Sequence, residues 1–98
     1  MKGTQDCFYN IQCSTYQQSI EVSVFENCNG WTAINTGDEV VTVEGIILLP
    51  ALVAGATGAA IQIGGNRGEI YKGRIQITFA GGGVAPSCQL IQKYYIAR

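Results

Sequence analysis

Short runs of β-branched residues alternate with Asn- and Gly-containing segments throughout residues 31–79. The clearest runs are residues 40–43 (VVTV), 61–63 (IQI) and 75–79 (IQITF). β-Branched side chains favour strands, and runs of this length with flanking turn signals are typical of strands rather than helices. This pattern constrains the fold more than any other feature, and it predicts about seven to eight short strands with no long helix.

The expected turns carry residues that accept left-handed backbone angles. Asn29 and Gly30 form an Asn-Gly pair, the strongest short hairpin signal, between an alternating strand over residues 18–26 and a return strand over 31–34. Successive hairpins of this kind favour an antiparallel meander. The other candidate turn residues are Gly37, Gly45, Gly64, Gly65, Asn66 and Gly68.

The remaining elements follow from the same signals. Pro50 ends a strand over residues 46–49, and the Ala- and Gly-rich residues 51–60 form an extended loop or a short helix. Strands are expected over 69–72, 74–79 and 88–96, with a glycine hinge or loop at 81–83. In the strand over 74–79, Ile75, Ile77 and Phe79 share one face.

With 98 residues, the chain is long enough for one hydrophobic core and too short for two. Residues 1–98 are therefore predicted to form a single domain. The fold class that fits best is an all-β, antiparallel sandwich, either Ig-like or jelly-roll-like, and a small barrel is the second choice.

Charged residues make up only 13% of the chain, against about 25% in typical globular proteins. Such a surface suits burial in an assembly of several subunits, and we expect a homo-oligomer. Residues 1–50 carry six acids and one lysine, whereas residues 51–98 carry five cations and one acid. These charges either face each other within one chain, or an acidic patch on one copy meets a basic patch on the next. Neither half is basic enough to predict nucleic-acid binding.

The four cysteines are Cys7, Cys13, Cys28 and Cys88. No C-x-x-C motif and no histidine accompany them, so neither a zinc finger nor a redox motif is indicated. Met1 leads directly into polar residues, which argues against a signal peptide and an oxidising compartment. We expect buried free thiols and no metal or cofactor. The alternatives are disulfide pairing, for which three connectivities are possible, and a metal bound by all four thiolates.

Residues 45–66 contain no charged residue over 22 positions, which is long enough to cross a bilayer as a helix. Pro50, Gly55 and Gly58 interrupt this run and disfavour a helix. Two strands around an Ala/Gly segment fit the composition better. A membrane helix is therefore the less favoured reading.

Catalysis is not expected. The chain has no histidine to act near neutral pH, and Asp38, Glu39 and Glu44 occupy turn or strand-edge positions. Residues 64–68 (GGNRG) lack the Lys-Ser/Thr ending of a phosphate-binding loop, and the Gly-x-x-Gly they contain lacks the helices of an RNA-binding clamp. A structural turn explains these glycines best.

Aromatic residues gather near the two ends of the chain, with Trp31 between them. Exposed aromatics could stack on sugars, which would make the chain a glycan- or ligand-binding module. In the alternative, Trp31 fills the core and the other aromatics contact neighbouring subunits. The candidate interface residues are Phe8, Tyr9, Leu52, Val53, Tyr71, Tyr94 and Tyr95.

Several segments together resemble small virion structural proteins of phages infecting Bacteroidetes. They are residues 34–37 (INTG), 41–45 (VTVEG), 48–50 (LLP), 63–70 (IGGNRGEI), 75–79 (IQITF) and 93–96 (KYYI). The resemblance covers about half of the chain and leaves residues 51–60 unmatched.

The resemblance implies a non-enzymatic particle component, such as a capsid decoration protein, a spike or fibre base, or a tail subunit. Its partners would be major capsid or tail subunits, and its location would be the virion, assembled in the host cytoplasm. The leading expectation is thus a structural subunit, with a glycan-binding module as the competing class and a membrane-anchored protein as the third.

Overall fold

The computed structural model describes residues 8–51 and 57–96, and in these residues it contains eight strands and no helix. The prediction of an all-β sandwich with seven to eight strands is confirmed. The strands are β1 (Phe8–Tyr16), β2 (Ile20–Ser23), β3 (Cys28–Asn35), β4 (Val41–Val43), β5 (Ile46–Leu48), β6 (Ala60–Gly64), β7 (Arg74–Phe79) and β8 (Cys88–Ile96).

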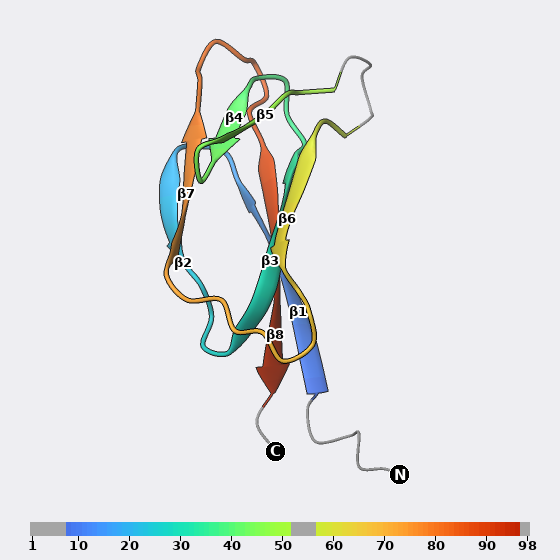
Figure 1. The fold of residues 1–98 in the computed structure, drawn as a ribbon. Coiled ribbons are helices and arrows are strands. Elements are labelled where there is room, and N and C mark those ends of the chain that lie inside the picture. Colours follow the sequence, from blue (N-terminus) through green and yellow to red (C-terminus); the bar gives the residue numbers. More distant parts are fainter. Residues whose placement is uncertain (1–7, 52–56, 97–98) are drawn as a thin grey trace.

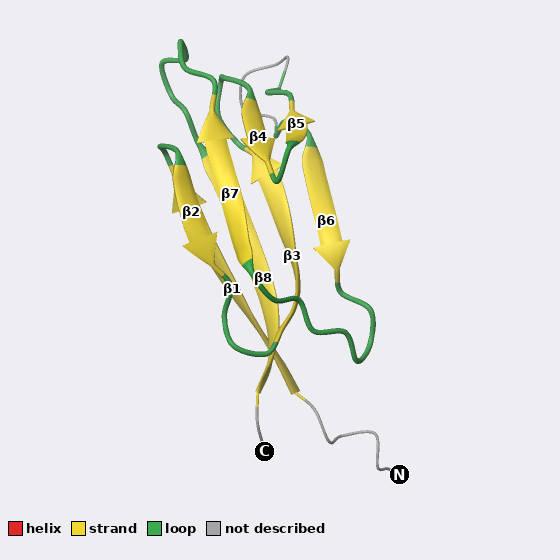
Figure 2. Cartoon of the chain, turned by 60° about the vertical axis from the view of Figure 1, so that its left-hand side comes forward, coloured by secondary structure: helices red, strands yellow, loops and turns green. Residues whose placement is uncertain are grey.

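The strands form two four-stranded antiparallel sheets that pack face to face (Figure 1). The first sheet has the order β1-β8-β3-β6, and the second has the order β2-β7-β4-β5. β1 and β8 continue beyond the strands of the second sheet, which gives the molecule an extent of 52 × 25 × 17 Å (Figure 2).

The expected meander is wrong, because β4 and β5 are the only consecutive strands in the described residues that pair with each other. Every other connection crosses from one sheet to the other. The reason lies in the burial of apolar side chains. Val22 of β2 lies opposite Ile75 of β7, and both are buried, so β2 pairs with β7 rather than with the nearby β3.

The predicted hairpin turn at Asn29 and Gly30 is also wrong, because both residues lie within β3. The reversal occurs just before them, where Cys28 N donates to Phe25 O at 3.1 Å and Asn27 takes a left-handed φ of 64°. A β-bulge at Asn29 shifts the register with β8 between Cys28 and Gly30. The Asn-Gly pair therefore serves a bulge instead of a two-residue turn.

Other expected turns agree with the structure. Glu44 and Gly45 take positive φ angles of 50° and 82° and join β4 to β5. Gly37 lies in the bend after β3. Gly64 ends β6, and Gly65, Asn66 and Gly68 lie in the bend and turn that follow it.

Two further strand predictions need correction. Residues 69–72 form a loop rather than a strand, because Gly68 and Gly73 on either side take positive φ angles that end any strand pairing. β1 was not among the expected strands, since it mixes Asn, Gln and Ser with its apolar residues. Of the Ala/Gly-rich residues 51–60, positions 52–56 lie outside the described residues.

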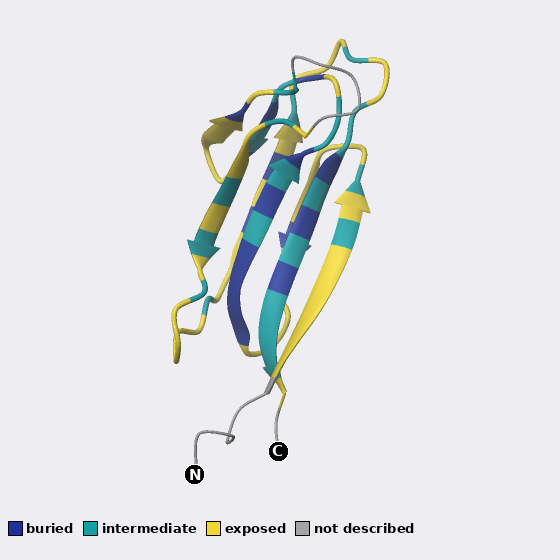
Figure 3. Ribbon diagram, turned by 90° about the vertical axis from the view of Figure 1, so that its right-hand side faces the viewer, coloured by how far each residue is buried: buried dark blue, intermediate teal, exposed yellow. Residues whose placement is uncertain are grey.

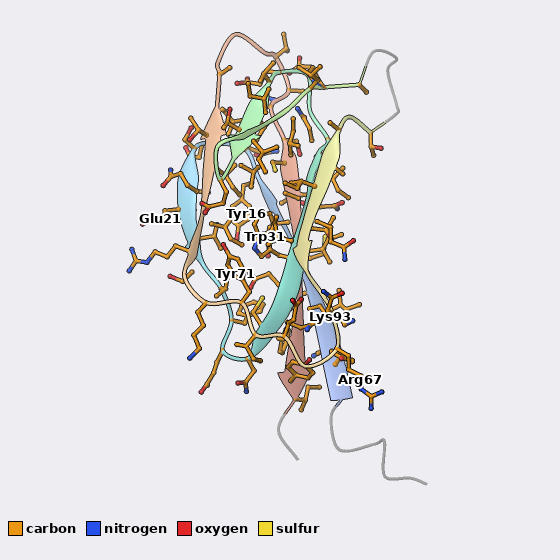
Figure 4. The ribbon with its side chains drawn as sticks, viewed as in Figure 1. Tyr16, Glu21, Trp31, Arg67, Tyr71 and Lys93 are labelled. Carbon is orange, nitrogen blue, oxygen red and sulfur yellow. The ribbon has the colours of Figure 1, made fainter. Side chains whose placement is uncertain are left out.

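The core lies between the sheets, where buried residues alternate with exposed ones along β7 and with half-buried ones along β4, the second half of β3 and the first half of β8. Trp31 is 2% exposed and meets Tyr71 edge-on, with 5.9 Å between ring centroids (Figure 4). Ile75 and Ile77 are fully buried, as the alternation in β7 predicts. The prediction that Trp31 fills the core is confirmed.

Candidate functional site

Three of the candidate interface tyrosines lie at the end of the molecule where β1 begins and β8 ends. The rings of Tyr9 and Tyr95 lie 4.8 Å apart, and Lys93 Nζ lies 4.0 Å from the centroid of the Tyr9 ring. Tyr9 lies directly opposite Tyr95, and Lys93 lies two residues before Tyr95 on β8. All three side chains are therefore on the face that points away from the second sheet. They form a cation–aromatic group on the outer face of the first sheet.

Tyr94 lies on the opposite face of β8 from Tyr95. Its ring meets Phe25 edge-on at 5.1 Å, and its hydroxyl accepts a hydrogen bond from Asn10 Nδ2 at 3.0 Å. The Tyr95 hydroxyl accepts from Gly68 N at 2.7 Å and from Asn29 Nδ2 at 3.2 Å. Tyr95 therefore also holds the turn after β6 in place.

The structure does not bring the other candidate residues to this group. Tyr71 packs against Trp31 in the core, and Leu52 and Val53 lie outside the described residues. Phe8 takes part in β1, where its backbone lies opposite Ile96. The aromatic residues thus divide between the core and the end of the first sheet.

The two outer faces of the sandwich differ in charge. The outer face of the second sheet carries Glu21 and Arg74, which form an ion pair at 2.9 Å, as well as Gln76 and Thr78. In the described residues, the outer face of the first sheet has one charged side chain, Lys93. Its members, from the strand registers, are Tyr9, Ile11, Cys13 and Thr15 of β1, Gln89, Ile91, Lys93 and Tyr95 of β8, Gly30, Thr32 and Ile34 of β3, and Ala60, Gln62 and Gly64 of β6.

β1 is the most exposed long strand of the molecule. Figure 3 shows the first sheet from its outer side, with the exposed β1 and the alternating β6 as its two edges. Ile11 in the middle of β1 is 63% exposed, and residues 9–13 are all exposed. A second group of exposed apolar side chains, Ile46, Ile47 and Leu49, lies at β5 on the edge of the other sheet.

The three carboxylates that the sequence singled out bind backbone amides. Asp38 accepts from Val84 N at 2.8 Å and from Ala85 N at 3.0 Å, and these bonds hold the pKa of the Asp38 carboxyl below its usual 3.8. Glu39 accepts from Gly81 N and Gly83 N, and Glu44 accepts from Gln76 N at 2.7 Å. Glu39 thereby anchors the glycine segment 81–83, and Asp38 anchors the two residues that follow it, so the segment expected to be a hinge or loop is a loop tied by backbone amides.

Three described cysteines are free thiols. Cys28 and Cys88 are fully buried, whereas Cys13 is exposed on β1, so burial was wrongly expected for Cys13. Burial raises the pKa of the Cys88 thiol to about 11 and also raises that of Cys28. In the described part of the chain, no three His, Cys, Asp or Glu side chains gather into a group that could hold a metal ion. Cys7 lies outside the described residues.

Two open pockets lie at opposite ends of the sandwich. One of about 920 Å³ is lined by residues from the end of β1, the start of β2 and the loop before β8. The other, of about 350 Å³, includes Phe25, Tyr71 and Lys72. Because Trp31 is buried, any sugar in the second pocket would have to stack on Phe25 or Tyr71.

No helix in the described residues is long and apolar enough to cross a membrane. Comparisons with protein families, with curated proteins and with solved structures found no match to this chain. The function must therefore be inferred from the surface of the protein itself. Sequence reasoning missed β1 as its main feature, although the absence of any charge over residues 8–16 was a signal that could have indicated it.

Proposed function

We propose that this protein is a non-enzymatic structural subunit of a phage virion that acts by contact with its neighbours. The observation that carries the proposal is the outer face of the first sheet, a broad surface on which the described residues include a single charged one, with an exposed, uncharged edge strand. The centres of subunit interfaces are depleted in charge and enriched in aromatic residues. Tyr9, Tyr95 and Ile11 supply that composition here.

The surroundings of the carboxylates and thiols support a structural rather than a catalytic task. Asp38, Glu39 and Glu44 are each occupied with backbone amides, and the buried thiols have raised pKa values that oppose nucleophilic reactivity. The assignment to a phage particle comes from the resemblance of the segments described above. Its partners there would be copies of itself and major capsid or tail subunits.

The proposal is tested on particles from a bacterial culture that produces this protein. The particles are banded on a density gradient, and each fraction is examined by mass spectrometry for peptides of this chain. We expect the peptides to follow the major capsid protein through the gradient at a fixed, high ratio. Peptides found only in the soluble fractions at the top of the gradient would contradict the proposal.

The pocket beside Phe25 and Tyr71 gives the glycan-binding alternative a specific location. A glycan screen with the purified chain, run beside light scattering, separates the two functions. A strictly monomeric chain that binds a sugar, with binding lost in Phe25→Ala, would replace the structural function with the glycan-binding one. An oligomeric chain without sugar binding supports the structural subunit.

A further inference from the structure

We propose that β1 pairs antiparallel with β1 of a second copy of this chain, so that two four-stranded sheets join into one sheet of eight strands. The inference rests on the proposed structural function and identifies the edge by which one subunit meets the next. Such a contact is isologous, because the same strand contributes from both copies about a two-fold axis.

The backbone groups of β1 that face its free edge can be identified from two hydrogen bonds. Tyr95 N donates to Asn27 O at 3.0 Å, on the β3 side of β8, so odd-numbered residues of β8 direct their backbone groups towards β3. Even-numbered residues of β8 therefore bond to β1, where they lie opposite even-numbered residues such as Asn10 and Gln12.

The odd-numbered residues of β1, which are Tyr9, Ile11, Cys13 and Thr15, consequently direct their N–H and C=O groups away from β8. The Ile11 N–H agrees with this assignment, because it donates to the Asn10 side-chain Oδ1 at 3.0 Å. In the part of the chain that the structure describes, no strand lies on that side of β1. The edge is a ready template for another strand.

β1 lacks the devices by which proteins normally protect an edge strand. Its nine residues include no charged residue, no proline and no glycine. The other edge strands are shorter: β6 has five residues, β2 has four and β5 has three. β6 also ends in Gly64 with a φ of 73°. β1 is thus the edge strand that offers the longest continuous row of backbone donors and acceptors. The edge strand that matches it best in length is β1 of a second copy.

Among the described residues, a second copy also meets no charge barrier at this edge. The nearest charged side chain on the joined face is Lys93 of β8. Its Nζ lies 4.0 Å from the centroid of the Tyr9 ring and so sits over β1; when Tyr9 of each copy lies opposite Thr15 of the other, the two Tyr9 residues are six positions apart along the strands, or about 20 Å. That exceeds the screening length of about 10 Å at 0.1 M salt, so their repulsion is weak.

One register uses all four edge-directed residues on both copies. It centres on Gln12, so that Ile11 lies opposite Cys13 of the second copy and Tyr9 lies opposite Thr15 of the second copy. Each of these pairs exchanges two backbone hydrogen bonds once the Asn10 side chain releases the Ile11 N–H, and the exposed Ile11 side chain gains a neighbour across the seam. The two Gln12 residues face each other as a non-hydrogen-bonded pair.

The first experiment measures self-association by sedimentation velocity over a range of concentrations. A single strand pair buries less surface than the roughly 1,200 Å² of a standard interface, so we expect a dimer that dissociates on dilution. Ile11→Lys places a charge on the edge and should weaken the dimer by about tenfold or more. Ile47→Lys is the matched control, because Ile47 is 64% exposed and lies on an edge of the other sheet.

Circular dichroism verifies that both lysine variants keep the wild-type β signal. Loss of association in Ile11→Lys alone supports the β1 contact. Equal association in Ile11→Lys and wild type, or loss in Ile47→Lys alone, overturns it. If the β1 contact is overturned in this way and the chain still associates through another surface, the proposed structural function is not contradicted. A wild-type chain that is monomeric at all concentrations also overturns the β1 contact, while the gradient experiment decides on the virion separately.

The second experiment tests the register by disulfide cross-linking. Gln12→Cys is made in a chain that also carries Cys7→Ser and Cys13→Ser, and Gln62→Cys in the same background is the control on the β6 edge. Residues of a non-hydrogen-bonded pair lie about 4.5 Å apart at Cα, within the range for a disulfide. Under mild oxidation, a covalent dimer of the Gln12→Cys protein supports the register. A dimer of the Gln62→Cys protein alone overturns it.

Discussion

Asn35 is fully buried at the end of β3, where its side chain holds three backbone groups, two in the bend after β3 and one in β5. Its Nδ2 donates to Glu39 O at 2.8 Å and to Leu48 O at 2.9 Å, and its Oδ1 accepts from Gly37 N at 3.0 Å. Asn29 has a similar task at the other end of the strand, where its Nδ2 donates to Asn66 O and Glu69 O. Asparagines that usually mark turns here fix the loops around a central strand.

Asp38 should make the stability of the fold depend on pH in acid. Its folded-state pKa is below the ordinary 3.8, so its contribution is fully present above pH 3.8 and is lost as the pH falls through the lower, folded-state pKa. Asp38→Asn should be less stable than wild type at neutral pH, and the difference should narrow below pH 3.8. Urea unfolding at a series of pH values measures this. A difference that stays constant down to the most acidic pH would show that the carboxylate charge is not involved.

The thiols should differ in reactivity according to burial. Iodoacetamide reacts with the thiolate, and a pKa of about 11 in place of 9.0 lowers the thiolate fraction of Cys88 about a hundredfold at pH 8. In the native protein, Cys13 should be labelled first, with Cys28 and Cys88 labelled only after unfolding in urea. Peptide mass spectrometry follows each site. We also expect four free thiols under denaturing, non-reducing conditions; a lower number would reveal a disulfide.

At the scale of elements, close approach between β3 and β6 requires glycine at Gly30. A Cβ on Gly30 would lie 2.4 Å from Gly65 N and 2.6 Å from Ile63 O, both of them backbone atoms. A Cβ on Gly45 would meet nothing within 4 Å, although its φ of 82° disfavours other residues. The two glycines are therefore needed for different reasons.

Gly30→Ala should destabilise the protein by at least about 2 kcal/mol, because β3 and β6 must separate to admit the methyl group. Gly45→Ala, the control, should lose only about 1 kcal/mol, from backbone strain in the turn. Equilibrium urea unfolding gives both free energies. A larger loss of unfolding free energy in Gly45→Ala than in Gly30→Ala would mean that β3 and β6 do not approach closely at Gly30.

The sequence pattern locates some elements well and their partners poorly. The alternation in β7 and the Glu44–Gly45 hairpin are local signals, and both are confirmed. The partners β1 with β8 and β2 with β7 come from distant parts of the chain, so no turn between them could reveal the pairing. The aromatic residues Tyr9 and Tyr95 were recognised by type. The free edge of β1 beside them was not recognised from the sequence, because whether a strand lies at an edge depends on the order of all the strands in the sheet.

For the whole molecule, charge is concentrated away from the surface proposed for assembly. The Glu21–Arg74 ion pair lies on the second sheet, and the outer face of the first sheet has Lys93 alone among the described residues. The alternative drawn from the sequence, an acidic patch on one copy against a basic patch on the next, would use other surfaces. The two arrangements differ in their response to salt.

Self-association through β1 should depend weakly on salt. Between about 0.05 and 0.5 M NaCl, the dissociation constant of the dimer should change by less than about threefold, since no charged pair of the described residues is close to the contact. Sedimentation velocity at several salt concentrations measures it. A steep loss of affinity with salt would instead favour contact between oppositely charged patches.

Because Phe8 pairs with Ile96, the first sheet of this fold can be completed only late in synthesis. Of the eight strands, β1 is made first and its partner β8 is made last, so the first sheet cannot close until all eight strands are available. Contacts so distant in sequence slow folding, because a long loop must close before they form. During that interval β1 is an uncharged strand with both sides unpaired. Protein concentration during synthesis should therefore decide how often two unfinished chains meet before each is complete.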